Sequence, residues 1–212
     1  MARQARPSQL IKVGKTKSAG SLSISASGNW LIVIGGHYVY VTRTSSTSAF
    51  TKYDSPERLT ALIAHPNEDY FATGDAIGQI RLWYCLSDED GSNQSTRNSS
   101  YKSQTTAMHW HAHAVSSLAF TPNGSYLISG GEESVLVIWQ LHSGKREFVP
   151  RVGAPIACIA VRSTRVGEEE YLLGLVDGSF VFVDSTTLSV ARSIIRVKLS
   201  EYESSPCVGS KV

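Results

Sequence analysis

An internal repeat constrains the fold of this chain more than any single motif does. LTALIAHPNEDYFATGDAIGQIRLW (59–83) and VSSLAFTPNGSYLISGGEESVLVIW (115–139) can be aligned at a constant offset. Their proline, glycine and tryptophan landmarks then coincide: Pro66 with Pro122, Gly74 with Gly130, and Trp83 with Trp139. A fixed period of this kind indicates a protein built from similar structural units.

Two further segments follow the same template. IACIAVRSTRVGEEEYLLGLVDGSFVFV (156–183) has a few extra residues in its first turn, and LSISASGNWLIVIGGHYVYV (22–41) has a shortened second turn. The sequence therefore predicts four units.

Each unit contains short apolar strands separated by turns. In the clearest copy the strands are 115–120, 126–129 and 135–139, and TPNG (121–124) and GGEES form the turns. The strands are rich in β-branched residues and almost continuously apolar, which indicates cover on both faces. A helical period is nowhere sustained, so we expect an all-β fold.

Small sheets packed radially, each between two neighbours, would satisfy this pattern. With its histidine, Pro-x-Gly turn, Ser-Gly pair, acid and closing tryptophan, the chain resembles the WD40-repeat family over about residues 20–200. The resemblance implies an open or partial β-propeller of about four blades. We expect the blades at 21–55, 56–104 (with a polar insertion at 86–104), 105–150 and 151–199, between a basic arm (1–20) and a polar tail (200–212).

The WD40 resemblance also implies a hydrogen-bonded structural tetrad in the third blade, formed by His111, Ser129, Glu133 and Trp139. Glutamate stands where the family usually has aspartate, and Tyr84 and Gln140 replace the acid that usually follows tryptophan.

The second blade retains only part of the tetrad, Thr73 and Trp83, with Ser55 and Ile77 at the histidine and acid positions. Because blades one and four lack the tryptophan, we expect most blades to be held by packing alone.

Three alternating histidines, His109, His111 and His113, raise the alternative of a metal site, because alternate strand residues face the same side. We favour structural roles, since no cysteine, aspartate or glutamate stands nearby to complete a ligand set. His65, beside Pro66, is predicted to be a turn residue. We therefore expect neither a metal nor a cofactor.

Composition and motifs argue against several classes of function. The net charge of +2 does not indicate a dedicated nucleic-acid-binding domain. No apolar run is long enough for a membrane span, and the three cysteines show no CxxC spacing. Phosphate-binding glycine motifs and the GxSxG motif are absent from the sequence. We expect no enzymatic activity, no small-molecule substrate and no membrane partner.

A narrower resemblance rests on SGGEESVLVIWQL, PRVGAPI (150–156), FATGDAIGQIRLW and HAHAVSSLAF. These segments resemble the WD-repeat subunits of the UtpA, or t-UTP, subcomplex of the small-subunit processome. The resemblance implies a nuclear, nucleolar scaffold in ribosome biogenesis, acting in pre-rRNA transcription and processing toward 18S rRNA. Its partners would be other processome WD-repeat subunits and pre-rRNA or small nucleolar ribonucleoprotein.

We expect contacts to RNA or an acidic partner at Lys145, Arg146 and Arg151, which we place on the turn between blades three and four. The alternative is a peptide-recognition propeller, such as a ubiquitin-ligase substrate receptor or a chromatin reader.

Four blades are too few for a seven-bladed ring, which needs about 300 residues at roughly 40–45 per blade. We expect either an N-terminal piece of a longer protein or an open arc with exposed strand edges. Expressed alone, the chain is predicted to be poorly soluble or oligomeric.

Overall fold

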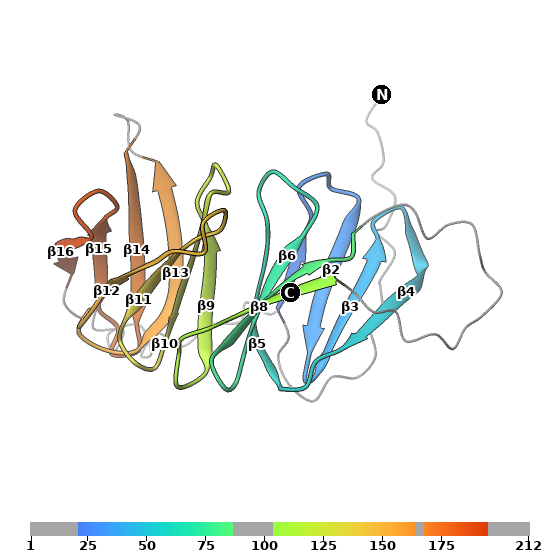
Figure 1. The fold of residues 1–212 in the computed structure, drawn as a ribbon, viewed down its shortest axis with the longest axis horizontal. Helices are drawn as coiled ribbons and strands as arrows, with labels where there is room; N and C mark the ends of the chain where they lie inside the picture. Colours follow the sequence, from blue (N-terminus) through green and yellow to red (C-terminus); the bar gives the residue numbers. More distant parts are fainter. Residues whose placement is uncertain (1–20, 87–103, 164–167, 195–212) are drawn as a thin grey trace, which may run out of the picture.

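The computed structural model describes residues 21–86, 104–163 and 168–194, and these form four antiparallel sheets of four strands each (Figure 1). The first sheet contains β1 (Leu22–Ile24), β2 (Trp30–Gly35), β3 (Tyr38–Arg43) and β4 (Ser46–Asp54). The second contains β5 (Leu59–Ala64), β6 (Phe71–Asp75), β7 (Gln79–Tyr84) and β8 (Gln104–His109). The third contains β9 (Val115–Phe120), β10 (Tyr126–Gly131), β11 (Leu136–Gln140) and β12 (Arg146–Val149). The fourth contains β13 (Ile156–Ser163), β14 (Glu169–Leu175), β15 (Phe180–Asp184) and β16 (Ser189–Ile194).

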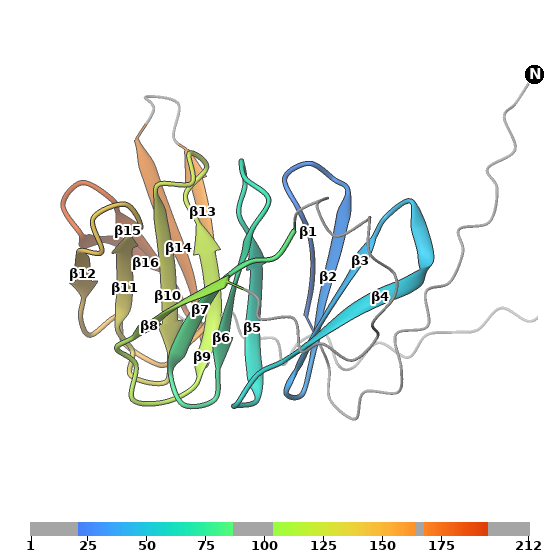
Figure 2. The ribbon, with the colours of Figure 1, turned by 45° about the vertical axis from the view of Figure 1, so that its right-hand side comes forward.

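The four sheets stand side by side as the blades of an arc (Figures 1 and 2). The first strand of each blade is the inner one, since β1, β5, β9 and β13 contact one another in succession. The predicted all-β class and the four blades of an open propeller are confirmed. The basic arm, most of the polar insertion and the polar tail lie outside the described residues.

One predicted blade boundary is wrong. We placed residues from 105 onward in blade three, but β8 pairs with β7 along its whole length, from Gln79 opposite His109 to Tyr84 opposite Gln104. The strand that follows the insertion therefore returns to blade two. There it satisfies the backbone groups on the edge of β7, which would otherwise lie unpaired.

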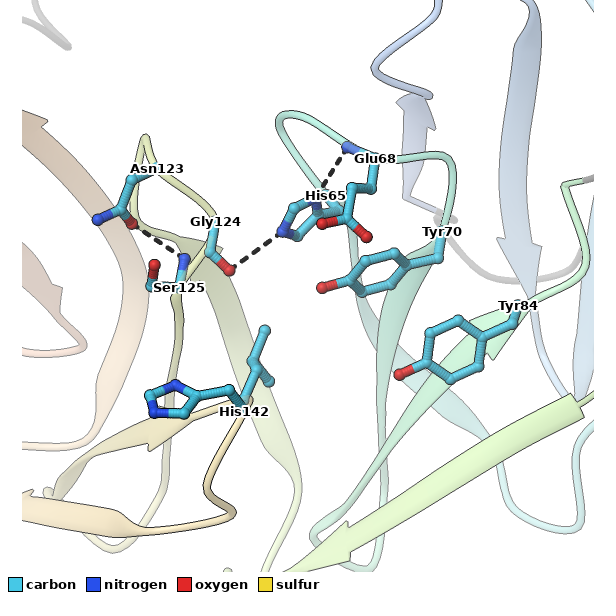
Figure 3. A pocket seen from close by; sticks show the side chains of 9 residues that line it. His65, Glu68, Tyr70, Tyr84, Asn123, Gly124, Ser125 and His142 are labelled. Carbon is cyan, nitrogen blue, oxygen red and sulfur yellow. Dashed lines mark hydrogen bonds between the residues drawn. The ribbon is translucent and has the colours of Figure 1, made fainter.

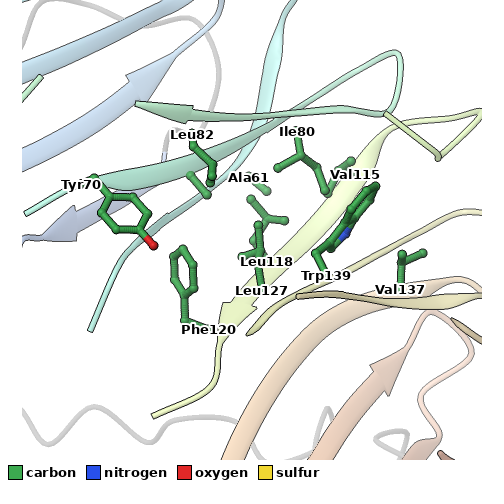
Figure 4. Close-up of a cluster of buried hydrophobic side chains, with 11 residues drawn as sticks. Ala61, Tyr70, Ile80, Leu82, Val115, Leu118, Phe120, Leu127, Val137 and Trp139 are labelled. Carbon is green, nitrogen blue, oxygen red and sulfur yellow. The ribbon is translucent and has the colours of Figure 1, made fainter. Parts of the chain in front are cut away.

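Three apolar layers fill the spaces between neighbouring blades, which explains why the strands are apolar on both faces. The layer between blades two and three is shown in Figure 4 and includes Leu82 from blade two and Leu118 and Trp139 from blade three. Trp83 lies in the layer between blades one and two. The third layer joins blades three and four around Ile128, Ile156 and Leu173 and their neighbours.

The repeated glycine of the sequence is explained by close packing between blades. A Cβ atom on Gly74 would lie 2.7 Å from Cβ of Val115, the first residue of β9. A Cβ atom on Gly130 would likewise lie 2.7 Å from Cδ1 of Ile156, the first residue of β13. In each case glycine, which has no side chain, leaves room for a branched residue of the next blade.

Most of the large apolar side chains that remain exposed belong to the first and last blades. Leu22 and Ile24 of β1 are 68% and 55% exposed, and Phe180 and Ile194 of blade four are also exposed. These blades each lack a neighbour on one side in the described structure. No helix within the described ranges is long and apolar enough to cross a membrane.

Candidate functional site

The four tetrad residues of blade three form one hydrogen-bonded chain. His111 lies between β8 and β9, Ser129 on β10, Glu133 in the β10–β11 turn, and Trp139 on β11. The indole Nε1 of Trp139 donates to Oγ of Ser129 at 2.8 Å, and that oxygen lies 2.8 Å from Nε2 of His111. Nδ1 of His111 lies 3.2 Å from Oε2 of Glu133. The structure therefore brings all four predicted residues together.

Burial and hydrogen bonding decide where the protons of the tetrad lie. Burial lowers the pKa of His111 despite the opposing effect of Glu133, so the ring is neutral at neutral pH. Burial alone raises the pKa of Glu133. Hydrogen bonds from its own backbone N–H, the N–H of His113 and the His111 ring outweigh that effect and leave the pKa below its ordinary value.

The ionised carboxylate accepts from Nδ1–H of His111, which leaves Nε2 to accept the hydroxyl proton of Ser129. The serine oxygen in turn accepts from Trp139, so each of these buried polar groups has a partner. The network ties β10, β11 and the two adjoining turns together, which is a structural function.

Two of the three alternating histidines, His111 and His113, share the carboxylate of Glu133, whereas His109 contacts another blade. The expectation that no glutamate lies near them was therefore wrong. Nε2 of His109 lies 3.2 Å from the carbonyl oxygen of Ile77 in blade two. His113 is 61% exposed, and its Nδ1 lies 3.3 Å from Oε1 of Glu133. Among the described residues, no group of three or more histidine, cysteine, aspartate or glutamate side chains is arranged to hold a metal ion.

Blade two retains only the indole half of the network. Nε1 of Trp83 donates to Oγ1 of Thr73 at 2.8 Å. Ser55 is buried, whereas the side chain of Ile77 is half exposed and, being apolar, adds no hydrogen bond to the network. The turn is closed instead by Asp75, whose Oδ1 accepts from the backbone N–H groups of Ile77 at 3.1 Å and Gln79 at 2.8 Å. Sequence reasoning missed Asp75, although its place directly before the Ala-Ile-Gly turn is a signal for such a cap.

His65 lies in the β5–β6 turn, and the structure gives it a second partner in the next blade. Its Nδ1 accepts the backbone N–H of Glu68 at 2.9 Å, so Nε2 carries the proton and donates to the carbonyl oxygen of Gly124 at 3.1 Å. The ring stacks on Tyr70 at 4.4 Å and meets Phe120 edge-on at 4.9 Å. This buried histidine therefore joins blades two and three.

Beside His65, a cavity of about 350 Å³ opens between blades two and three (Figure 3). Residues of both blades line it: His65, Glu68, Tyr70, Tyr84, Asn123, Gly124, Ser125, Leu141 and His142. The sequence had drawn attention to His65, Tyr84 and the turn at 121–124 separately, but it did not predict the cavity, which depends on two turns that are far apart in the chain.

The predicted basic cluster is not continuous, and its location was partly wrong. Lys145 lies in the β11–β12 turn and Arg146 begins β12, so both belong to blade three. Arg151 follows β12 and is the only member on the connection to blade four, where its φ is 58°. The outer strand separates them because it forms between 146 and 149, a segment that sequence reasoning read as a turn.

Radially packed four-stranded sheets with a Trp–Ser–His–acid hydrogen-bond network define a WD40 β-propeller protein. More narrowly, residues 18–167 match the family described as the first beta-propeller of WD repeat-containing protein 75, and the chain belongs to this family. The predicted WD40 family is confirmed.

Curated relatives include proteins of the same name and one named for U3 small nucleolar RNA. WD repeat-containing protein 75 of Xenopus laevis is 40% identical over 130 residues, covering 58% of this chain, and the Mus musculus protein is 34% identical over 154 residues, covering 68%. U3 small nucleolar RNA-associated protein 17 of Schizosaccharomyces pombe is 37% identical over 105 residues, covering 49%. The matches span 14%, 17% and 13% of these relatives, respectively, so the chain corresponds to a small part of each.

Proposed function

We propose that this chain is a non-catalytic scaffold module of the small-subunit processome, acting in the nucleolus in pre-rRNA transcription and processing toward 18S rRNA. The observation that carries the proposal is membership of the family of the first propeller of WD repeat-containing protein 75. The similarity to a protein named as associated with U3 small nucleolar RNA supports the ribosome-biogenesis assignment over the peptide-receptor alternative.

The architecture suits a scaffold. Three buried apolar layers and the hydrogen bonds between blades hold the turns in fixed positions, so the faces and outer strands present a rigid surface. Other WD-repeat subunits of the processome are the proposed protein partners, and the exposed apolar side chains of blades one and four are available to them.

An assay in cells tests this function. The tagged 212-residue chain is expected to concentrate in nucleoli, to co-sediment with large pre-rRNA particles and to enrich U3 small nucleolar RNA over an unrelated nuclear RNA. Co-purification with a ubiquitin-ligase adaptor in place of U3 RNA, or a diffuse distribution through the nucleus, would contradict the assignment.

The basic residues Lys145, Arg146 and Arg151 remain the proposed contacts to RNA or an acidic partner. All three are exposed, and Nη1 of Arg146 donates to the carbonyl oxygen of His109 at 3.4 Å.

Replacing all three basic residues by alanine is expected to weaken binding to a single-stranded pre-rRNA fragment. The slope of log K against log[salt] is expected to become shallower by about 0.7 per lost phosphate contact. A matched triple variant at Lys52, Arg58 and Arg192 removes the same charge elsewhere. Equal losses in both variants would show that only overall charge matters.

A further inference from the structure

The cavity between blades two and three is lined by polar groups besides those that hold the blades together. Its blade-two side carries the carboxylate of Glu68 and the phenol rings of Tyr70 and Tyr84. Figure 3 shows both phenol hydroxyls directed into the space toward blade three, with His142 on the opposite side. The cavity therefore has an acidic, aromatic side and a turn-lined side.

Glu68 is an exposed carboxylate, and no ion pair joins it to another residue of the described ranges. The backbone N–H of Glu68 donates to Nδ1 of His65, which fixes the backbone position from which the Glu68 side chain extends. The negative charge is thus available to a ligand.

Tyr70 and Tyr84 form a tilted pair, with ring centroids 5.1 Å apart and an angle of 39° between the planes. Tyr70 is almost buried, whereas Tyr84 is 44% exposed and presents ring surface to an incoming group. Burial, and to a smaller extent the charge of Glu68, raises the pKa of Tyr70, so its phenol keeps its proton at neutral pH. Cations are attracted both to a carboxylate such as that of Glu68 and to aromatic faces.

The cavity is formed in advance of any ligand. His65 connects the two turns that border it, because its ring donates to the carbonyl oxygen of Gly124. Gly124 has φ +76°, and a Cβ atom there would lie 2.2 Å from Nε2 of His65, so the close approach of the turns requires glycine. A preformed site loses less conformational entropy when a ligand binds.

We propose that this cavity binds a cationic side chain, in the first instance arginine, from an extended segment of a protein partner. A guanidinium group can donate to the Glu68 carboxylate while its plane lies against the exposed ring of Tyr84. About 350 Å³ accommodates one long side chain and no folded element. A phosphate group would be repelled by Glu68, so a protein ligand is favoured over RNA. The inference does not depend on which assembly contains the chain.

The test uses the full 212-residue chain, labelled with ¹⁵N, and the peptide acetyl-Gly-Arg-Gly-amide. Titration is expected to shift the backbone amide signals of cavity residues, above all Glu68, Asn123, Ser125 and His142. The same peptide with citrulline in place of arginine has nearly the same shape but no charge. It is expected to bind at least about threefold more weakly, as loss of an exposed ion pair predicts.

Two variants locate the interaction. Glu68→Gln is expected to weaken arginine binding by about threefold to fivefold, and Tyr84→Leu by about twofold to fivefold. Glu132→Gln, which neutralises an exposed carboxylate in the β10–β11 turn outside the cavity, is the matched control and is expected to bind like the parent chain. Glu68 is exposed, so its variant is expected to keep the parent spectrum in the absence of peptide.

Several results would overturn the proposal. These are equal binding of the arginine and citrulline peptides, unchanged binding by Glu68→Gln, shifts confined to residues outside the cavity, or no shifts up to the solubility limit of the peptide. Stronger binding of uridine or adenosine than of the arginine peptide at the same residues would assign the cavity to a nucleobase instead. None of these results bears on nucleolar localisation, so the two proposals stand or fall separately.

Discussion

Blades two and three share one backbone plan but close their turns in different ways. In both, the tryptophan of the third strand lies opposite an apolar residue of the second, Phe71 with Trp83 and Leu127 with Trp139. In both, the indole donates to a buried hydroxyl at 2.8 Å. Only blade three adds a histidine and an acid, so the indole–hydroxyl pair and the packing around it are the common requirement.

The difference teaches that the backbone groups of the turn must be satisfied, whereas the residue that does so can vary. In blade three, Glu133 reaches back from the turn to His111 and to the backbone N–H of His113. In blade two, Asp75 caps its own turn from the end of β6. The two acids therefore contact different segments. Glu133 contacts the segment that leads into β9, whereas Asp75 contacts the turn that directly follows it.

The largest expected effect tests what the two blades share. Trp139→Ala and Trp83→Ala are each expected to lower the free energy of unfolding by about 3–5 kcal/mol, because each removes a buried indole from a layer between blades. Urea unfolding followed by circular dichroism, at one protein concentration for all variants, measures the change. Trp30→Ala, at a partly buried site, is the control and should cost less. If Trp83→Ala costs less than half as much as Trp139→Ala, the proposed equivalence of the blades is wrong.

The second largest effect distinguishes the tetrad of blade three from the matching positions of blade two. His111→Ala is expected to cost about 2–4 kcal/mol of unfolding free energy, because it leaves the Ser129 hydroxyl and the Glu133 carboxylate without their ring partner. Ser55→Ala, at the matching position of blade two, is expected to cost less than about 1 kcal/mol.

A double-mutant cycle of His111→Ala with Glu133→Ala, measured by the same urea unfolding, should give a coupling of about 0.5–3 kcal/mol. Strict additivity of the two substitutions would mean that the contact between ring and carboxylate contributes nothing.

A smaller effect concerns the local cap of blade two. Asp75→Ala is expected to cost about 1–2 kcal/mol of unfolding free energy, since the backbone N–H groups of Ile77 and Gln79 lose a charged acceptor. Asp75→Asn retains an oxygen at that place and should cost less. Thermal unfolding of both variants, with amide hydrogen exchange at Gln79, provides the measurement. An Asn variant as destabilised as the Ala variant would point to charge instead of hydrogen bonding.

The smallest expected effect is a pH dependence that arises from the tetrad of blade three. The pKa of His111 is lowered in the folded chain, so the unfolded chain binds the extra proton as pH falls below about 6.5. Stability is therefore fully present above that pH and declines as the solution is acidified toward the folded-state pKa. The lowered pKa of Glu133 acts in the same direction at lower pH.

Urea midpoints of the parent chain and His111→Leu, compared between pH 7.5 and 5.5, measure this dependence. A parent chain as insensitive to acid as the variant would rule out titration of this ring.

Much of the fold could be predicted because strands and turns have local sequence patterns. The β9 strand has its predicted bounds, Val115–Phe120, since an apolar run between turn residues defines a strand without reference to the rest of the chain. The fourth strand of each blade was harder to locate. β8 and β16 are almost fully exposed, so their sequences lack the apolar pattern that marks a buried strand.

The candidate site shows the same division. The resemblance to the WD40 family was enough to place His111, Ser129, Glu133 and Trp139 in one network, because these residues stand at the positions of the family's hydrogen-bonded tetrad. The bond from His65 to Gly124 and the cavity beside it could not be read in this way. They depend on how two turns from different blades approach each other, and no period relates one turn to the other.

By itself, the sequence determined the all-β class, the four repeated units and the residues at the centre of each sheet, since burial demands an apolar pattern wherever it occurs. Only the tertiary structure decided that β8 completes blade two, that the basic residues stand at opposite ends of β12, and that Glu68, Tyr84 and His142 border one cavity. Those outcomes depend on backbone edges and exposed side chains, whose positions follow from packing between blades and not from local pattern.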